Sequence, residues 1–386
     1  MGITSSRLSV KFAGLDLTSP IIAASAPPTE SAAAMLACAK AGAGAVVTKS
    51  IVDYDRADWP NIPRRVKHDQ KRLWIQGSFA SETLTLAEGE AMIHATRAAS
   101  GIPIIASVGV LDPNSDVSIE TAIRLASAGA NLIHFDLFYL PQPRCTDAMV
   151  VSLASLFARA RASLPVKFGP KLNSDIPAHL FASAFDPTSV DCVFLLDSIR
   201  VPPPLGIDGV PLIDSWSGGL ECSLFGGDWQ KPITYQYARV LADAGMPELC
   251  VGGGLRGSED IVEAIMLGAT TAQVATQLIV QGYDWITKTN DRLLQFLDAS
   301  GASDLASLRG LGLRTRDQNA PEQVKPVRAV VDASKCDPCG VCTKLVFCPF
   351  IEKQLNGVPV ISDACYGCGL CEELCPHPGA IRMEAI

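Results

Sequence analysis

The chain has 386 residues, of which 48% are hydrophobic, and it carries a formal net charge of −8 at pH 7. That length supports one large barrel or two medium-sized domains, each with its own core. The acidic balance and the lack of a basic cluster argue against a nucleic-acid partner. No apolar run reaches the ~20 residues of a membrane-spanning helix, and the amino terminus lacks a secretory pattern. We therefore expect a cytoplasmic protein with no membrane partner.

Strand-like runs alternate with helical stretches along residues 1–320, which we expect to form the first domain. The runs are PIIAAS (20–25), AVVTKS (45–50), IPIIASVG (102–109), NLIHFDLF (131–138), PVKFG (165–169), CVFLLDS (192–198), ELCVGGG (248–254) and TAQVAT (271–276). Stretches such as SIETAIRLASAGA and SEDIVEAIMLGA lie between them. Eight such units predict an α/β fold of the (β/α)8 barrel type. A doubly wound sheet is the alternative, although no GxGxxG segment opens the first helix.

Polar residues cluster where these predicted strands end, which is where barrel enzymes carry their active sites. The residues are Ser25, Lys49, Ser107, Asp136, Lys167, Asp197 and Ser198, with Gly252, Gly253 and Gly254 after the seventh strand. A single lysine at such a position more commonly forms a structural ion pair. Two lysines, two aspartates and a glycine-rich loop in equivalent positions indicate a binding site. Glycines next to a helix N-terminus present backbone N–H groups to a phosphate.

The last part of the chain, residues 321–386, is expected to be a second domain that binds metal. Eight of the 13 cysteines lie there, in two groups. The first reads Cys336-x2-Cys339-x2-Cys342-x5-Cys348-Pro, and the second reads Cys365-x2-Cys368-x2-Cys371-x3-Cys375-Pro. The β-rich segments VRAVVDASKC and GVPVISDAC lead into the two groups, which indicates an internal duplication.

This spacing resembles that of the bacterial two-cluster ferredoxins, in which three thiolates of one group and one of the other hold each 4Fe–4S cluster. The resemblance implies two ligand sets. They are Cys336, Cys339, Cys342 and Cys375 for one cluster, and Cys365, Cys368, Cys371 and Cys348 for the other. Four-cysteine zinc is the alternative, but it normally uses two CxxC pairs. The x5 gap before Cys348 is longer than the usual x3, so we expect an enlarged loop there.

Taken together, the motifs resemble those of the dihydroorotate dehydrogenase superfamily. The segments that carry the resemblance are LSVKFAGLDLTSPIIAASAPPT, AVVTKS, the FASE turn (79–82), VKFGP, LLDS, VGGGLRGSEDI and AQVAT. The chain is most similar to the part of dihydropyrimidine dehydrogenase in which an FMN barrel precedes a two-cluster ferredoxin module. The resemblance therefore implies FMN as a cofactor besides the two 4Fe–4S clusters.

The same resemblance assigns roles to individual residues. Ala24 and Ser25 would approach the flavin ring, Lys49 would contact the flavin and its ribityl chain, and Lys167 would lie near N1 and O2. A cation suits that place because reduced flavin is anionic there. Ser107 is a further cofactor candidate at a strand end, and Ser198 would lie near both flavin and substrate. The phosphate would be held by Gly226, Gly227, Gly253, Gly254, Ala275 and Thr276.

The substrate positions depart from the family pattern. Three asparagines that read the amide edge of a pyrimidine are replaced by Gln76, Asp136 and Asp197. The proton-exchanging Cys or Ser is replaced in register by Tyr139, and Cys145 lies six residues further on. Tyr139 and Cys145 are thus both candidates for the proton-transferring group, and a standard pyrimidine is not the expected substrate.

An ionised aspartate only accepts hydrogen bonds, whereas an asparagine amide also donates them. Two interpretations of Asp136 and Asp197 follow. Either the substrate carries N–H donors or a positive charge, or burial keeps an aspartate protonated so that it donates. A structural alternative is that Arg144 and Arg200, on the same loops, neutralise the two carboxylates.

These residues predict an oxidoreductase acting on a CH–CH group of a small cyclic amide, amidine or enone. Because no dinucleotide fingerprint is present, we expect electrons to come from a partner protein, either an FAD/NAD(P) diaphorase subunit or a ferredoxin. A homodimer or a larger complex is expected. The alternatives are an electron-transfer subunit without substrate chemistry and a flavin-based sensor.

Overall fold

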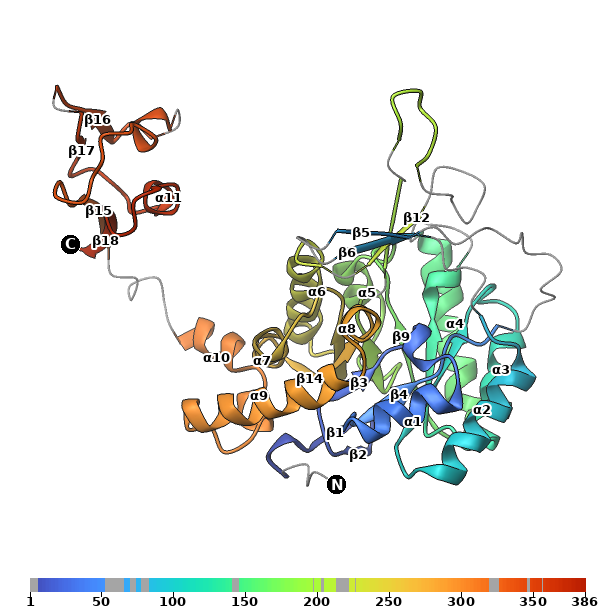
Figure 1. The fold of residues 1–386 in the computed structure, drawn as a ribbon. Coiled ribbons are helices and arrows are strands. Elements are labelled where there is room, and N and C mark those ends of the chain that lie inside the picture. Colours follow the sequence, from blue (N-terminus) through green and yellow to red (C-terminus); the bar gives the residue numbers. More distant parts are fainter. Residues whose placement is uncertain are drawn as a thin grey trace. The chain divides into compact units, whose positions relative to one another are not determined.

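In the computed structural model the chain divides into two compact units, Met1–Arg314 and Thr315–Ile386 (Figure 1). The first unit thus ends at Arg314, against the proposed boundary at residue 320. The structure describes residues 6–52, 66–69, 74–77, 83–140, 146–196, 198–202, 205–212, 222–225, 227–318, 326–345, 348–355 and 357–386. No helix among these residues is long and apolar enough to cross a bilayer.

Eight parallel strands close a barrel in the described part of the first unit. They are β3 (Ile21–Ala23), β4 (Ala45–Val47), β7 (Ile104–Gly109), β8 (Leu132–Asp136), β9 (Lys167–Lys171), β10 (Cys192–Phe194), β13 (Glu248–Gly252) and β14 (Ala269–Val274). They follow one another around the barrel in chain order, and β14 pairs with β3 to close it. Each overlaps one of the eight predicted runs, so the predicted (β/α)8 fold is confirmed.

Helices cover the outer surface of this barrel (Figure 1). They are α1 (Ala32–Lys40), α2 (Leu86–Ala99), α3 (Val117–Ser127), α4 (Asp147–Ser163), α5 (Ala178–Ala184), α6 (Lys231–Asp243), α7 (Ser258–Met266), α8 (Thr276–Gln281) and α9 (Asp284–Ser300). A further helix, α10 (Leu311–Gln318), spans the boundary between the two units. The starts of α1, α2 and α4 are encoded locally by side-chain caps. In α2 the Glu88 N–H donates to Thr85 Oγ1, while the Thr85 N–H donates to Glu88 Oε2, which is a capping box. Between helices and strands, the rings of Phe135, Phe157 and Phe168 pack together.

A short hairpin closes the amino-terminal end of the barrel. Its strands are β1 (Val10–Phe12) and β2 (Leu15–Leu17). Phe12 and Leu17 pack in one apolar cluster with Leu132 and Phe194 from the barrel strands. The ring of Phe12 meets that of Phe194 edge-on, with 5.6 Å between centroids. Because this end is filled by apolar side chains, a polar site is left to the opposite end.

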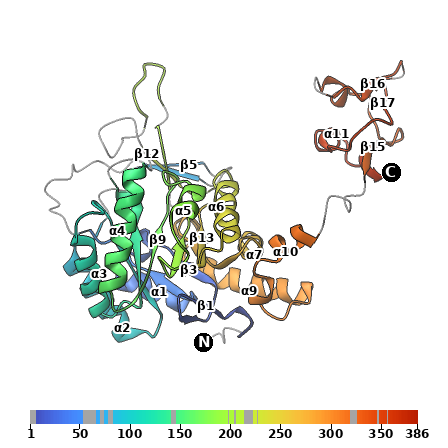
Figure 2. The same cartoon turned by 180° about the vertical axis from the view of Figure 1, so that it is seen from behind.

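A small antiparallel sheet lies at the other end of the barrel. It is formed by β11 (Ile199–Val201), β12 (Cys222–Phe225), β6 (Trp74–Gly77) and β5 (Val66–Asp69), in that order. Figures 1 and 2 show it at the end opposite to β1. Since β11 follows closely on β10, this sheet marks the carboxyl end of the barrel strands.

The C-terminal unit is built from two short antiparallel ladders. β15 (Val327–Val331) pairs with β18 (Ile381–Ala385), and β16 (Ile351–Lys353) pairs with β17 (Pro359–Ile361). One turn of 3-10 helix, η8 (Cys342–Lys344), and the helix α11 (Leu370–Glu373) complete it. β15 precedes the first cysteine group and β17 the second. The duplication seen in the sequence is therefore also a structural duplication.

Candidate active site and cluster sites

The carboxyl ends of four neighbouring strands bring predicted site residues together. Ala24 follows β3, Lys49 follows β4, Ser107 lies in β7, and Asp136 ends β8. All four are buried, with exposed fractions of 5%, 7%, 0% and 3%. A lysine and an aspartate buried at the mouth of a barrel are chemically unlike the apolar cluster at its other end. This contrast marks the mouth as the candidate active site.

A hydroxyl that no sequence pattern singled out joins these residues. Ser50 Oγ donates to Asp136 Oδ2 over 3.1 Å, and it lies 3.1 Å from Ser25 Oγ. Ser107 Oγ donates to Ser50 Oγ over 3.4 Å. The other carboxylate oxygen, Asp136 Oδ1, accepts from the Phe138 N–H at 3.2 Å. The residues at the ends of β3, β4, β7 and β8 therefore form one hydrogen-bonded network.

The prediction that Lys167 lies near the flavin is corrected by its place in the barrel. Lys167 begins β9 and pairs in register with Leu132, a residue of the apolar cluster at the closed end. It is exposed, and a Cβ built on Gly14 would stand 3.3 Å from its Nζ. Burial raises the pKa of Cys192 well above its usual value. The negative charge of Glu248 adds to this rise, and the positive charge of Lys167 opposes it. Lys167 thus belongs to the amino-terminal end.

The lysine at the mouth is Lys171, four residues further along β9. Four residues of strand span about 13 Å. Lys171 pairs in register with Asp136 and is 5% exposed. Burial raises the pKa of Cys250 to about 12, and the positive charge of Lys171 partly offsets this rise. Lys171 is therefore a second buried cation beside Asp136, besides Lys49, and the strand pattern of the sequence did not indicate it.

Tyr139, the candidate proton donor, lies in the 3-10 turn η5 (Leu137–Tyr139) directly after Asp136. Its ring packs on Gly109, where an added Cβ would stand 3.0 Å from Tyr139 Cδ2. Arg200 holds this turn. Its guanidinium lies 4.9 Å from the Phe138 ring centroid and donates to the carbonyls of Phe138 and Leu140. Tyr139 is thus fixed beside the end of β7, at the rim of the mouth.

Several predicted residues lie outside the described part of the chain. They are Cys145, Asp197 and Gly226, together with Arg144, the FASE turn and the side chain of Gln76. The backbone of Gln76 is described and pairs with Leu224 in the small sheet at the mouth. Ser198 is buried between β10 and β11.

The predicted phosphate cradle has the backbone geometry that the prediction needs. Gly227, Gly253 and Gly254 have φ angles of 85°, 96° and 83°, which other residues rarely adopt. A Cβ at Gly254 would come within 2.7 Å of the Gly227 oxygen, so the two loops touch. Ala275 and Thr276 open α8 directly after β14. Close-packed glycine backbone together with Lys49 and Lys171 fits an anionic, phosphate-bearing cofactor such as FMN.

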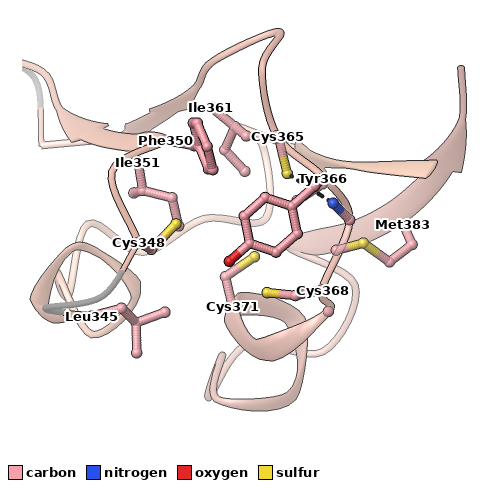
Figure 3. A pocket seen from close by; sticks show the side chains of 13 residues that line it. Leu345, Cys348, Phe350, Ile351, Ile361, Cys365, Tyr366, Cys368, Cys371 and Met383 are labelled. Atoms are coloured by element: carbon pink, nitrogen blue, oxygen red, sulfur yellow. Dashed lines mark hydrogen bonds between the residues drawn. The ribbon is translucent and has the colours of Figure 1, made fainter. Parts of the chain in front are cut away.

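The C-terminal unit contains two hollows, each lined by four cysteines. Figure 3 shows the first, in which Cys348, Cys365, Cys368 and Cys371 surround the same space. Its other walls are apolar and aromatic, with Phe350, Ile361 and Tyr366 among them. The Tyr366 ring meets Phe350 edge-on at 5.4 Å. The Gly367 N–H points at Cys365 Sγ over 3.5 Å, a contact that stabilises negative charge on sulfur.

The second hollow is lined by the other four cysteines of the tail, Cys336, Cys339, Cys342 and Cys375. Each hollow therefore takes three thiols from one repeat and one from the other. Among the described residues, no three His, Cys, Asp or Glu side chains converge tightly enough for a single metal ion. The donor set of each hollow, four soft thiols and no oxygen ligand, fits an iron–sulfur cluster.

Metal analysis gives a direct test of these two hollows. Protein purified without oxygen is expected to contain about eight iron atoms and about eight acid-labile sulfides per chain, since each four-thiol set holds one 4Fe–4S cluster. Iron, zinc, sulfide and FMN should be measured on the same sample. Zinc in stoichiometric amount with no labile sulfide would contradict the assignment.

A barrel with basic residues and a glycine cradle at its mouth, joined to a unit with two four-thiol sites, defines a flavin- and iron–sulfur-dependent oxidoreductase. The comparisons with known proteins agree. Residues 328–376 match the family described as a 4Fe-4S dicluster domain. This match confirms the prediction of 4Fe–4S clusters, and the similarities reported next agree with the prediction of FMN.

The barrel is similar to dihydroorotate dehydrogenases. The catalytic subunit of dihydroorotate dehydrogenase B (NAD(+)) of Thermoplasma acidophilum is 26% identical over 320 residues, covering 80% of this chain and 99% of that protein. The corresponding subunit of Methanosarcina acetivorans is 26% identical over 317 residues, covering 77% and 94%. The crystal structure of the Eimeria tenella enzyme with ferulenol shares the fold, with a TM-score of 0.63 at 17% identity, over 81% of this chain and 90% of that one. The resemblance to the dihydroorotate dehydrogenase superfamily, with a C-terminal ferredoxin portion, is confirmed.

Proposed function

We propose that this protein is an FMN- and iron–sulfur-dependent oxidoreductase that acts on a CH–CH group of a small cyclic molecule. The observation that carries the proposal is the buried group of Lys49, Asp136 and Lys171 at the mouth of the barrel. When bound, FMN supplies two-electron exchange with a substrate carbon and one-electron exchange with iron–sulfur clusters. The two four-thiol sites in the same chain support a route by which electrons reach the barrel.

The roles of the chain's own residues follow from charge and position. Lys171 and Lys49 are buried cations, so they would stabilise negative charge that develops on a cofactor or substrate at the mouth. The loops of Gly227, Gly253 and Gly254, continued by Ala275 and Thr276, would hold the phosphate through backbone N–H groups. Ala24, Ser25 and Ser107 would line the ring, with Ser198 near the substrate. Tyr139 or Cys145 would transfer the proton.

The substrate is proposed to be a cyclic amide, amidine or enone other than a standard pyrimidine. Where the family pattern has asparagine, this chain has Asp136, which accepts hydrogen bonds from the Ser50 hydroxyl and the Phe138 N–H. A pyrimidine carbonyl facing it would meet an acceptor instead of a donor. An unpaired buried polar group of this kind costs about 1–3 kcal/mol. Gln76 and Asp197 are proposed to contact the same substrate.

We expect that neither uracil nor dihydroorotate is turned over at a rate typical of enzymes, which is about 1–1000 per second. Photoreduced protein should be mixed without oxygen with cyclic amides, amidines, enones, uracil and orotate, and flavin reoxidation followed by absorbance. Reoxidation by an amidine or enone, with none by uracil, is the expected pattern. Rapid turnover of uracil would contradict the proposed substrate class.

A second candidate is an electron-transfer subunit whose barrel has no substrate chemistry of its own. The replaced asparagines favour it, because they remove the amide-reading groups. The same screen separates the two candidates: reoxidation by none of the compounds, with normal electron exchange between flavin and a ferredoxin, would favour the electron-transfer subunit. In either case the proposed partner is a diaphorase subunit or a ferredoxin, and the proposed assembly is a homodimer or larger, in the cytoplasm.

A further inference from the structure

Ser50 lies at the centre of the network at the barrel mouth. Its Oγ is 3.1 Å from Asp136 Oδ2, 3.1 Å from Ser25 Oγ and 3.4 Å from Ser107 Oγ. Ser50 and Ser107 are 2% and 0% exposed, so water competes little for these bonds. The four side chains come from the ends of four different strands. Among the described residues, Ser50 is therefore the hydroxyl that contacts Ser25, Ser107 and Asp136 together.

The direction of the bonds can be worked out from the donors. The Phe138 N–H can only donate, so Asp136 Oδ1 is an acceptor. Ser50 has a single hydroxyl hydrogen, and it is directed to Asp136 Oδ2. The lone pairs of Ser50 then face Ser25 and Ser107, so both of these hydroxyls donate to Ser50. The Ser25 and Ser107 hydrogens consequently point at Ser50 Oγ, and the Ser50 hydrogen points at the carboxylate of Asp136.

This direction depends on the carboxylate. An asparagine at position 136 would keep its oxygen on the Phe138 N–H and turn its amide N–H groups towards Ser50. Ser50 would then accept, and its own hydrogen would have to point elsewhere. Ser50 and the Phe138 N–H thus orient the Asp136 carboxylate as a hydrogen-bond acceptor. Any further partner at that carboxylate must also donate.

We propose that Ser50 is a positioning and specificity-determining residue, which holds Asp136 as a hydrogen-bond acceptor and so selects substrates with an N–H donor or a cationic amidine group at that point. This proposal rests on the proposed function, because it assumes that the substrate binds at the mouth of the barrel. It names the substrate class more narrowly: an amidine or other N–H-rich ring is selected over a ring that presents a carbonyl.

The test uses two ring compounds of nearly equal shape, 2-iminopiperidine, a cyclic amidine, and 2-piperidone, the corresponding lactam. Their dissociation constants for the full-length protein loaded with FMN would be measured from the perturbation of the flavin spectrum. The wild type is expected to bind the amidine about 10–100-fold more tightly, the usual effect of a hydrogen bond to a charged group. Ser50→Ala should reduce this ratio by about tenfold, whereas Ser50→Thr, which keeps the hydroxyl, should preserve it.

A second measurement tests the contact without any ligand. The infrared carboxylate band of Asp136, identified by its loss in Asp136→Asn, should shift in Ser50→Ala and stay in place in Ser50→Thr. FMN content reports that each variant is folded. An unshifted band and an unchanged binding ratio in Ser50→Ala would overturn the role of Ser50. A shifted band in a protein that oxidises or reduces no compound in the screen would instead count against the proposed function and leave the Ser50–Asp136 contact established.

Discussion

Replacing Lys171 by methionine is expected to slow the step between flavin and substrate by about 10²–10³-fold. A loss of rate of this size is typical when one preorganised group that stabilises developing charge is removed. Lys171 is buried beside Asp136, so its charge is shielded from water and its electrostatic interactions are weakened less by solvent. Methionine keeps most of the side-chain volume, so packing at the end of β9 is retained. The rate would be measured by stopped-flow reoxidation of the photoreduced flavin.

Lys167→Met is the matched control, because it makes the same substitution on the same strand. Lys167 is exposed and lies at the closed end of the barrel, level with Leu132. The rate in this variant is expected to stay at the wild-type value. A large loss in Lys167→Met, with wild-type behaviour of Lys171→Met, would show that the assignment by strand position is wrong.

Replacing Cys339 and Cys368 together by alanine is expected to abolish reduction of the flavin by a reduced ferredoxin. Each substitution removes one thiol from one of the two four-cysteine hollows. Because each cluster needs four thiolates, iron content should fall in both sites. FMN should remain bound, since the barrel has its own core, and photoreduction of the flavin should persist.

Cys38→Ala provides the control for loss of a thiol. Cys38 is buried in α1 and lines neither of the two four-cysteine hollows, as expected of a packing residue. Iron content and ferredoxin-driven reduction should be unchanged in this variant. Normal reduction of the flavin by ferredoxin in the double variant would show that electrons reach the barrel without the clusters.

The sequence pattern alone could not tell which lysine of the fifth barrel strand lies at the mouth. The pattern placed the fifth strand at residues 165–169, with Lys167 among the polar residues where the predicted strands end. In the structure β9 runs from Lys167 to Lys171 and includes Pro170, which pairs in register with Phe135. Shifting the strand by two residues keeps the alternation of side chains but moves Lys167 to the opposite end of the barrel.

Ser50 could not be selected from the sequence for a different reason. It sits next to Lys49 in AVVTKS, but serine is common and a single hydroxyl has no characteristic spacing. Its importance comes from three partners that are 25, 57 and 86 residues away. Closure of the barrel brings those partners together, and no local pattern reports which strand ends become neighbours.

The sequence predicted the architecture and, through its resemblance to two-cluster ferredoxins, two sets of four cysteines. Alternation of strand and helix patterns is a local property, so eight βα units predicted the barrel, and short cysteine spacings predicted two thiol sets within one small unit. Which side chains lie at the mouth of the barrel follows only from the tertiary structure. Which lysine lies beside Asp136, and which hydroxyl orients it, depend on strand register and barrel closure. Both depend on contacts between residues far apart in the sequence, such as the pairing of β14 with β3 and the packing of Phe12 on Phe194.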